Sequence, residues 1–168
     1  MTRFTRLSLL LTLAFLAAPS PRVAQAQSAA SPAPTLVVAA RNTTAESETA
    51  RPARSTVLPN DRLVYTLTFS NPTGRTLKNV ELKNPIPAGV HLVAGTTHAS
   101  RSDARVEFSA DGGKSWSAQP MERVMVDGAE AMRPVPAARY THVRWTVAGN
   151  VAPLATVTAD FEARVGGT

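Results

Sequence analysis

Residues 63–70 carry an apolar side chain at every second position, and this alternation constrains the fold more than any other feature of the sequence. The alternating apolar residues are Leu63, Tyr65, Leu67 and Phe69. A period of two sustained over such a stretch is typical of a strand with one buried face. The same period returns over residues 155–165. Both ends of the compact part of the chain are therefore expected to be strands.

Further short β-prone segments are separated by Pro, Gly, Asn and Asp. They cover residues 35–40, 76–84, 104–110, 121–126 and 140–149, and residues 41–55 read as a polar loop. No window has a clear helical period, and turn signals about every ten residues are typical of an all-β sandwich. We expect a single Ig-like β-sandwich with Greek-key strand order. Its expected inward-facing residues are Tyr65, Leu67, Phe69, Val80, Leu82, Val143, Trp145, Val147 and Phe161.

Residues 1–26 have the three regions of a secretory signal peptide. Arg3 and Arg6 precede an apolar run over residues 7–18, and a small-x-small site follows at residues 24–26. The apolar run is shorter than the roughly 20 residues of a membrane-spanning helix, which disfavours an uncleaved anchor. We therefore expect cleavage before Gln27 and a location in the periplasm or outside a bacterial cell.

The length that remains after cleavage fits one domain. The mature chain has 168 − 26 = 142 residues and no cysteine, so its stability must come from one apolar core without disulfides. We divide the chain into the signal peptide (1–26), a leader with one short strand and a polar loop (27–56) and the sandwich (57–168).

Removal of the three arginines of the signal peptide leaves 15 basic and 12 acidic residues, a net charge of +3. The arginines are dispersed, so nucleic acid is not an expected partner.

The residue types that carry catalysis or bind metals do not cluster in the sequence. His91, His98 and His142 have no partner at a metal-ligand spacing. The chain has no nucleophilic-serine motif, and nothing aims the nearest acidic pair, Glu107 and Asp111, at a common point. We expect no enzymatic activity, no metal and no cofactor.

The stretch "SADGGKSW" has the spacing of an Asp-box, a hairpin motif found repeatedly in sialidase propellers. The motif residues are Ser109, Asp111, Gly113 and Trp116. Asp111 can accept backbone N–H groups of its own turn, and glycine supplies positive φ angles. The chain is too short for a propeller, so we interpret the motif as a structural β-turn. Contact of Asp111 and Trp116 with a cation or a sugar is the alternative.

Four blocks of the sequence together resemble the bacterial conserved-repeat domain, also called domain of unknown function eleven. The blocks are "VLPNDRLVYTLTFSNPTG", "LKNVELKNPIPAGVHLVAGT", "VEFSADGGKSW" and "YTHVRWTVAGNVAPLATVTADFEARV", within residues 57–165. Asn60 stands where that family usually has Gly, and Leu154 with Ala155 replaces a Gly-containing turn. The resemblance implies an Ig-like sandwich of exported or surface proteins, without catalytic residues.

These features lead us to expect an exported, non-enzymatic structural or interaction module of the cell envelope. Its partners would be other envelope or surface proteins, surface polymers or a second copy of the chain, with no stable membrane insertion after cleavage. One alternative is a subunit of an extracellular fibre, in which the leader donates Leu36, Val37 and Val38 to a neighbour's sheet. Another is a carbohydrate-binding protein or small hydrolase that uses the Asp-box-like turn.

Overall fold

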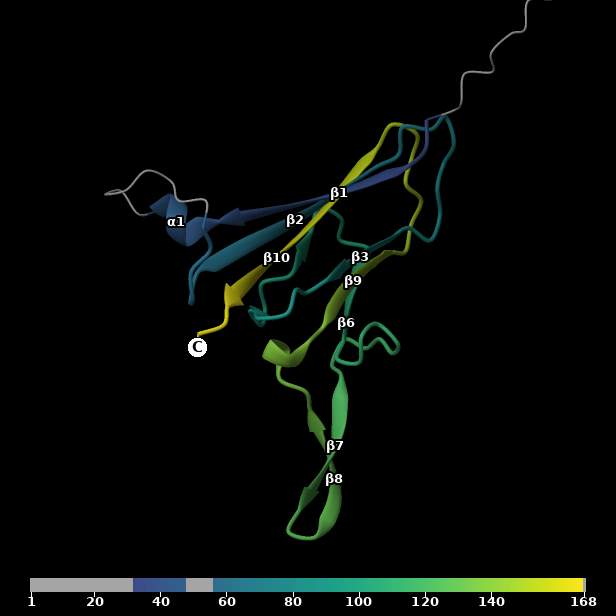
Figure 1. Cartoon of the computed structure of the whole chain (residues 1–168). Coiled ribbons are helices and arrows are strands. Elements are labelled where there is room, and N and C mark those ends of the chain that lie inside the picture. Colours follow the sequence, from purple (N-terminus) through teal and green to yellow (C-terminus); the bar gives the residue numbers. More distant parts are fainter. Residues whose placement is uncertain (1–31, 48–55, 168) are drawn as a thin grey trace, which may run out of the picture. The chain divides into compact units, whose positions relative to one another are not determined.

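The computed structural model describes residues 32–47 and 56–167, which form an antiparallel β-sandwich (Figure 1). The expected all-β fold is thus confirmed. The expected signal peptide, residues 1–26, lies outside the described residues. Within the described ranges, no helix has the length and apolar character needed to cross a membrane.

The first sheet is built around the two segments with the clearest alternation. In order across the sheet its strands are β1 (Thr35–Asn42), β2 (Arg62–Ser70), β10 (Thr156–Val165) and β4 (Val90–Leu92), with β5 (His98–Ala99) also paired to β10. All of these pairs are antiparallel. Every second residue of β2 and β10 faces inward, as a period of two requires.

The second sheet has three strands, in the order β3 (Glu81–Pro85), β9 (His142–Val147) and β6 (Ala104–Ser109). The chain passes from one sheet to the other after β2, β3, β5 and β9. The central strand β9 alternates between buried and half-buried residues, so its apolar side chains line the space between the sheets.

The core lies between the inner faces of the two sheets. Of the nine residues expected there, Tyr65 is partly buried and packs on the core, and the others are buried: Leu67, Phe69, Val80, Leu82, Val143, Trp145, Val147 and Phe161. Trp145 and Phe161 come from opposite sheets, and their ring centroids lie 6.2 Å apart. This contact joins the two layers.

The polar segment expected to be a loop over residues 41–55 contains a short helix, α1 (Thr43–Ser47). Asn42 accepts a hydrogen bond from the backbone N–H of Ala45 (3.0 Å), which is an N-cap geometry. Its side-chain amide also donates to Asp61 (2.7 Å). These bonds tie the end of β1 to the start of β2. A 3-10 turn, η1 (Ala137–Arg139), precedes β9.

A hairpin is inserted between β6 and β9 and contributes little to the core. It consists of β7 (Met121–Val126) and β8 (Ala129–Pro134) and is drawn in green in Figure 1. The backbone N–H of Val135 donates to Pro120 (2.9 Å) and closes the hairpin at its base. Every residue of β8 is exposed.

The two positions that depart from the conserved-repeat pattern both have left-handed backbone. Asn60 has φ 68° and Leu154 has φ 59°. Glycine adopts this conformation without a steric penalty, whereas other residues rarely do. Both positions therefore have a backbone conformation that glycine favours, although neither residue is glycine.

Candidate functional site

The Asp-box-like turn is held together by the carboxylate of Asp111. One oxygen accepts the hydroxyl of Ser109 (2.7 Å) and the backbone N–H groups of Lys114 (3.1 Å) and Ser115 (3.0 Å). The other oxygen accepts the hydroxyl of Ser115 (2.6 Å). These bonds, with Ser115 the largest contributor, hold the pKa of the Asp111 carboxyl well below its ordinary value. The carboxylate is thus occupied by its own turn.

The remaining motif residues pack against the outer face of the second sheet. Gly112 and Gly113 have φ angles of 78° and 85°. A Cβ on Gly113 would lie 3.6 Å from the ring of Trp116. That ring meets His142 edge to face, with centroids 6.2 Å apart, and the guanidinium of Arg144 lies over it. The sequence spacing therefore brings all four motif residues into one turn, and the sheet covers part of the indole.

A cavity of about 340 Å³ lies beside this turn, next to the base of the β7–β8 hairpin. Its lining includes Asp111, Trp116 and Glu122. Arg133 (2.9 Å) and Arg139 (2.6 Å) donate to Glu122 and lower the pKa of its carboxyl. Both carboxylates that line this cavity are therefore already bonded to protein groups.

The histidines are dispersed in the structure as in the sequence. His91 bonds the backbone carbonyl of Ala138 (2.8 Å), and His142 bonds the hydroxyl of Thr141 (3.1 Å). His98 lies in β5, opposite Asp160. Within residues 32–47 and 56–167, no three His, Cys, Asp or Glu side chains are grouped in a way that could hold a metal ion.

The leader strand β1 pairs with β2 of the same chain and forms the edge of the first sheet. Leu36 and Val38 lie opposite Phe69 and Leu67, so they share the inner face of that sheet. Sheet packing nevertheless leaves them 40% and 43% exposed, and Val37, on the outer face, is 60% exposed. One long backbone edge and three large apolar side chains are thus accessible together.

The other edge strands of the two sandwich sheets, within the described part of the chain, carry features that discourage pairing. β3 has Glu81 and Lys83 and ends at Pro85, and β6 has Arg105 and Glu107. β4 and β5 have only three and two residues. Charges, proline and short length are the usual means by which proteins block edge-to-edge association. Residues 35–40 of β1 contain neither charge, proline nor glycine.

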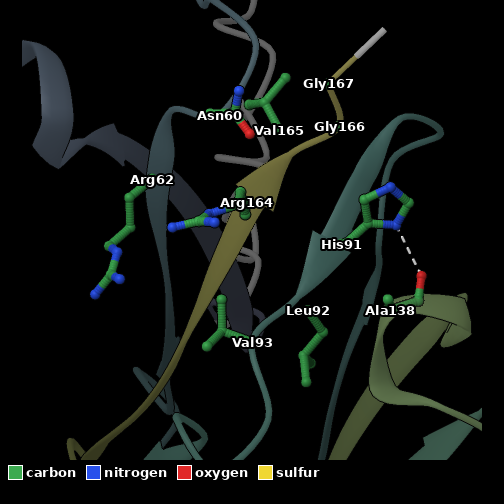
Figure 2. A pocket seen from close by; sticks show the side chains of 10 residues that line it. All are labelled: Asn60, Arg62, His91, Leu92, Val93, Ala138, Arg164, Val165, Gly166 and Gly167. Carbon is green, nitrogen blue, oxygen red and sulfur yellow. Dashed lines mark hydrogen bonds between the residues drawn. The ribbon is translucent and has the colours of Figure 1, made fainter.

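Sequence reasoning missed two further surfaces. The outward side of the β7–β8 hairpin exposes Met121, Met125 and Met132. A cavity of about 530 Å³ lies at the end of β10, and its lining includes Arg62, Arg164 and His91 (Figure 2). Those residues belong to three different strands, so only the register of the sheet brings them together.

Neither a comparison with models of known protein families nor one with functionally curated proteins gives a match to this chain.

Proposed function

We propose that this protein is an exported, non-enzymatic interaction module of the bacterial cell envelope, which binds an extended segment of another protein along β1. The observation that carries the proposal is the accessible edge of β1, with Leu36, Val37 and Val38 exposed beside it. Strand addition supplies affinity through main-chain hydrogen bonds, and alternate side chains supply specificity.

The two faces of β1 give the added segment different surroundings. Leu36 and Val38 continue the inner face of the sheet, so apolar side chains of a partner can extend the core there. Val37 faces outward beside Thr68. We therefore expect a partner strand with apolar residues at alternate positions.

The proposal also draws on the resemblance of residues 57–165 to the conserved-repeat domain, which implies an exported sandwich without catalytic residues. The left-handed residues Asn60 and Leu154 occupy the two positions at which that family usually has glycine-containing turns. An exported sandwich of this kind acts through its surface. The bonded carboxylates of Asp111 and Glu122 also favour an interaction module over the sugar-cleaving alternative.

The second candidate is a fibre subunit that donates β1 itself to a neighbour. This alternative is favoured by the small amount of apolar surface that β1 buries, since all of its residues are exposed except the half-buried Asn42. Releasing such a strand from β2 sacrifices little hydrophobic stabilisation. Release of β1 would still break its backbone hydrogen bonds to β2 and the hydrogen bond from Asn42 to Asp61.

A photo-crosslinking amino acid at position 37 tests strand addition in cells that export the protein. Val57 is the matched control, because it is 49% exposed and lies outside every strand. We expect adducts from position 37 and none from position 57, and the adduct mass distinguishes a second copy from another protein. Equal crosslinking at both positions would contradict the proposal.

A disulfide that locks β1 in place separates strand addition from strand donation. Ala39 and Thr66 are directly opposed on β1 and β2, and the chain has no cysteine of its own. Ala39→Cys with Thr66→Cys should therefore close one crosslink within the sheet. Strand addition persists in the oxidised protein, whereas donation stops until the bond is reduced.

A further inference from the structure

Two arginines lie directly opposite each other on neighbouring strands of the first sheet. Arg62 of β2 and Arg164 of β10 are register partners, and Figure 2 shows both side chains extending to the same side of the sheet. Like charges in directly opposed positions destabilise a sheet. A ligand that neutralises them would remove this cost.

Among the described residues, only one of the two arginines has a carboxylate partner. Arg62 donates to Glu162 (3.0 Å). Within the part of the chain that the structure describes, the guanidinium of Arg164 takes part in no ion pair or hydrogen bond. The pair therefore retains a net positive charge, with the donors of Arg164 available.

A cavity accompanies this positive charge. It has a volume of about 530 Å³, and its lining includes Arg62, Arg164, Asn60, His91 and Gly166. A Cβ on Gly166 would lie 3.2 Å from His91 Nε2 and 3.2 Å from the carbonyl of Gly89, so a larger residue there would crowd the cavity. The volume is within the range of small-molecule sites, which commonly run from about 300 to 1,000 Å³.

The imidazole of His91 is oriented by the protein. Its Nδ1 lies 2.8 Å from the carbonyl oxygen of Ala138, which can only accept, so Nδ1 carries the proton (Figure 2). The other nitrogen, Nε2, is directed to the Gly166 side. His91 is the register partner of Arg164, so this second polar atom, a hydrogen-bond acceptor in the neutral ring, lies beside the arginines.

We propose that this cavity binds an oxyanion, a phosphate or carboxylate group carried by a small molecule. Guanidinium groups donate paired N–H groups in a geometry that matches both kinds of anion. Arg164 supplies the free donors, Arg62 shares its charge between Glu162 and the anion, and Gly166 keeps the space open. The site lies at the opposite end of β2 from its pairing with the start of β1, and it does not depend on the function proposed for β1.

Calorimetric titration of the purified mature protein at low ionic strength tests the site. The probes are inorganic phosphate, glycerol 3-phosphate and citrate, which separate a free anion, a phosphate ester and a carboxylate. We expect saturable binding of at least one probe and a loss of affinity of about tenfold or more in Arg164→Ala. Arg105→Ala is the matched control, because it removes one exposed arginine from the other sheet.

The outcomes decide the proposal in either direction. Binding that weakens in Arg164→Ala and not in Arg105→Ala supports it, and the best probe identifies the anion class. Absence of saturable binding by all three probes, or equal loss in both variants, overturns it. Thermal unfolding gives a second readout, because a ligand that binds only the folded state raises Tm. The best probe should raise Tm of the wild type and of Arg105→Ala more than that of Arg164→Ala.

Discussion

The guanidinium of Arg144 lies over the indole of Trp116, with its central carbon 4.5 Å from the ring centroid. The same guanidinium bonds Glu107 of β6 (2.6 Å) and pairs with Glu81 of β3 (3.4 Å). One side chain of the central strand β9 therefore links both neighbouring strands and the Asp-box-like turn. Such an arrangement fixes the turn to the sheet and supports its interpretation as a structural element.

The two tryptophans should differ in their contribution to stability. Trp145 is 2% exposed in the core, so Trp145→Ala should lower the free energy of unfolding by about 3–5 kcal/mol. Trp116 is half-buried over a turn, and Trp116→Ala should cost less. Denaturant melts of both variants give the comparison. A larger loss for Trp116→Ala would mean that the turn, and not the space between the sheets, is the main apolar contact.

Stability should fall in acid partly through Asp103. Arg101 donates two bonds to this carboxylate (2.6 and 2.8 Å), Gly149 N–H donates a third (2.9 Å), and the pKa of Asp103 is lowered from 3.8 to about 2. Because the pKa is lower in the folded state, the ionised carboxylate stabilises the fold above pH 3.8. This stabilisation is lost as the pH falls to about 2. Denaturant midpoints measured across this range should decline less steeply for Asp103→Asn than for the wild type. Parallel curves would show that the carboxylate does not contribute.

Leu154→Gly should stabilise the protein. Leu154 has φ 59° and is 80% exposed, so its side chain buries little while its backbone is strained. Removing the backbone strain of a left-handed leucine outweighs the destabilising effect of glycine's extra freedom in the unfolded chain. We therefore expect the free energy of unfolding to rise by about 1 kcal/mol. Leu154→Ala is the control, since alanine keeps the strain. Chemical denaturation that shows equal gains in both variants would attribute the effect to the lost side chain instead.

The mature protein should begin at Gln27. Intact-mass measurement on periplasmic or secreted material after expression in a bacterium tests this expectation from the signal-peptide pattern. A mass that still includes residues 7–18 would indicate a membrane-tethered module.

The main strands could be predicted because their side chains alternate between a buried and an exposed face. In β2, β9 and β10 the apolar residues that alternate in the sequence are the ones that face the core. Strand β8 escaped prediction because all its residues are exposed and Ala and Glu are poor strand formers. Asp127 and Gly128 connect it to β7 with φ angles of 51° and 82°. That Asp-Gly pair is a strong hairpin signal and could have revealed the strand.

At the candidate sites, residue groups that are close in the sequence could be predicted, whereas groups that are distant in the sequence could not. The Asp-box-like residues lie close in the sequence, so their spacing was sufficient to predict one turn. Arg62 and Arg164 become neighbours only because β10 pairs with β2 in one register. A shift of that register by one residue would move Arg164 to the other face of its sheet. Periodicity shows which face a residue takes but not which distant residue lies beside it.

The hydrogen bond between Val135 and Pro120 has a consequence for engineering. It brings the two ends of the β7–β8 hairpin together, so the hairpin joins the sandwich through one narrow neck. A surface segment with adjacent ends can be exchanged for another of different length without displacing its framework. The connection between β6 and β9 is therefore a natural grafting position, at which a foreign peptide could be displayed on a cysteine-free scaffold.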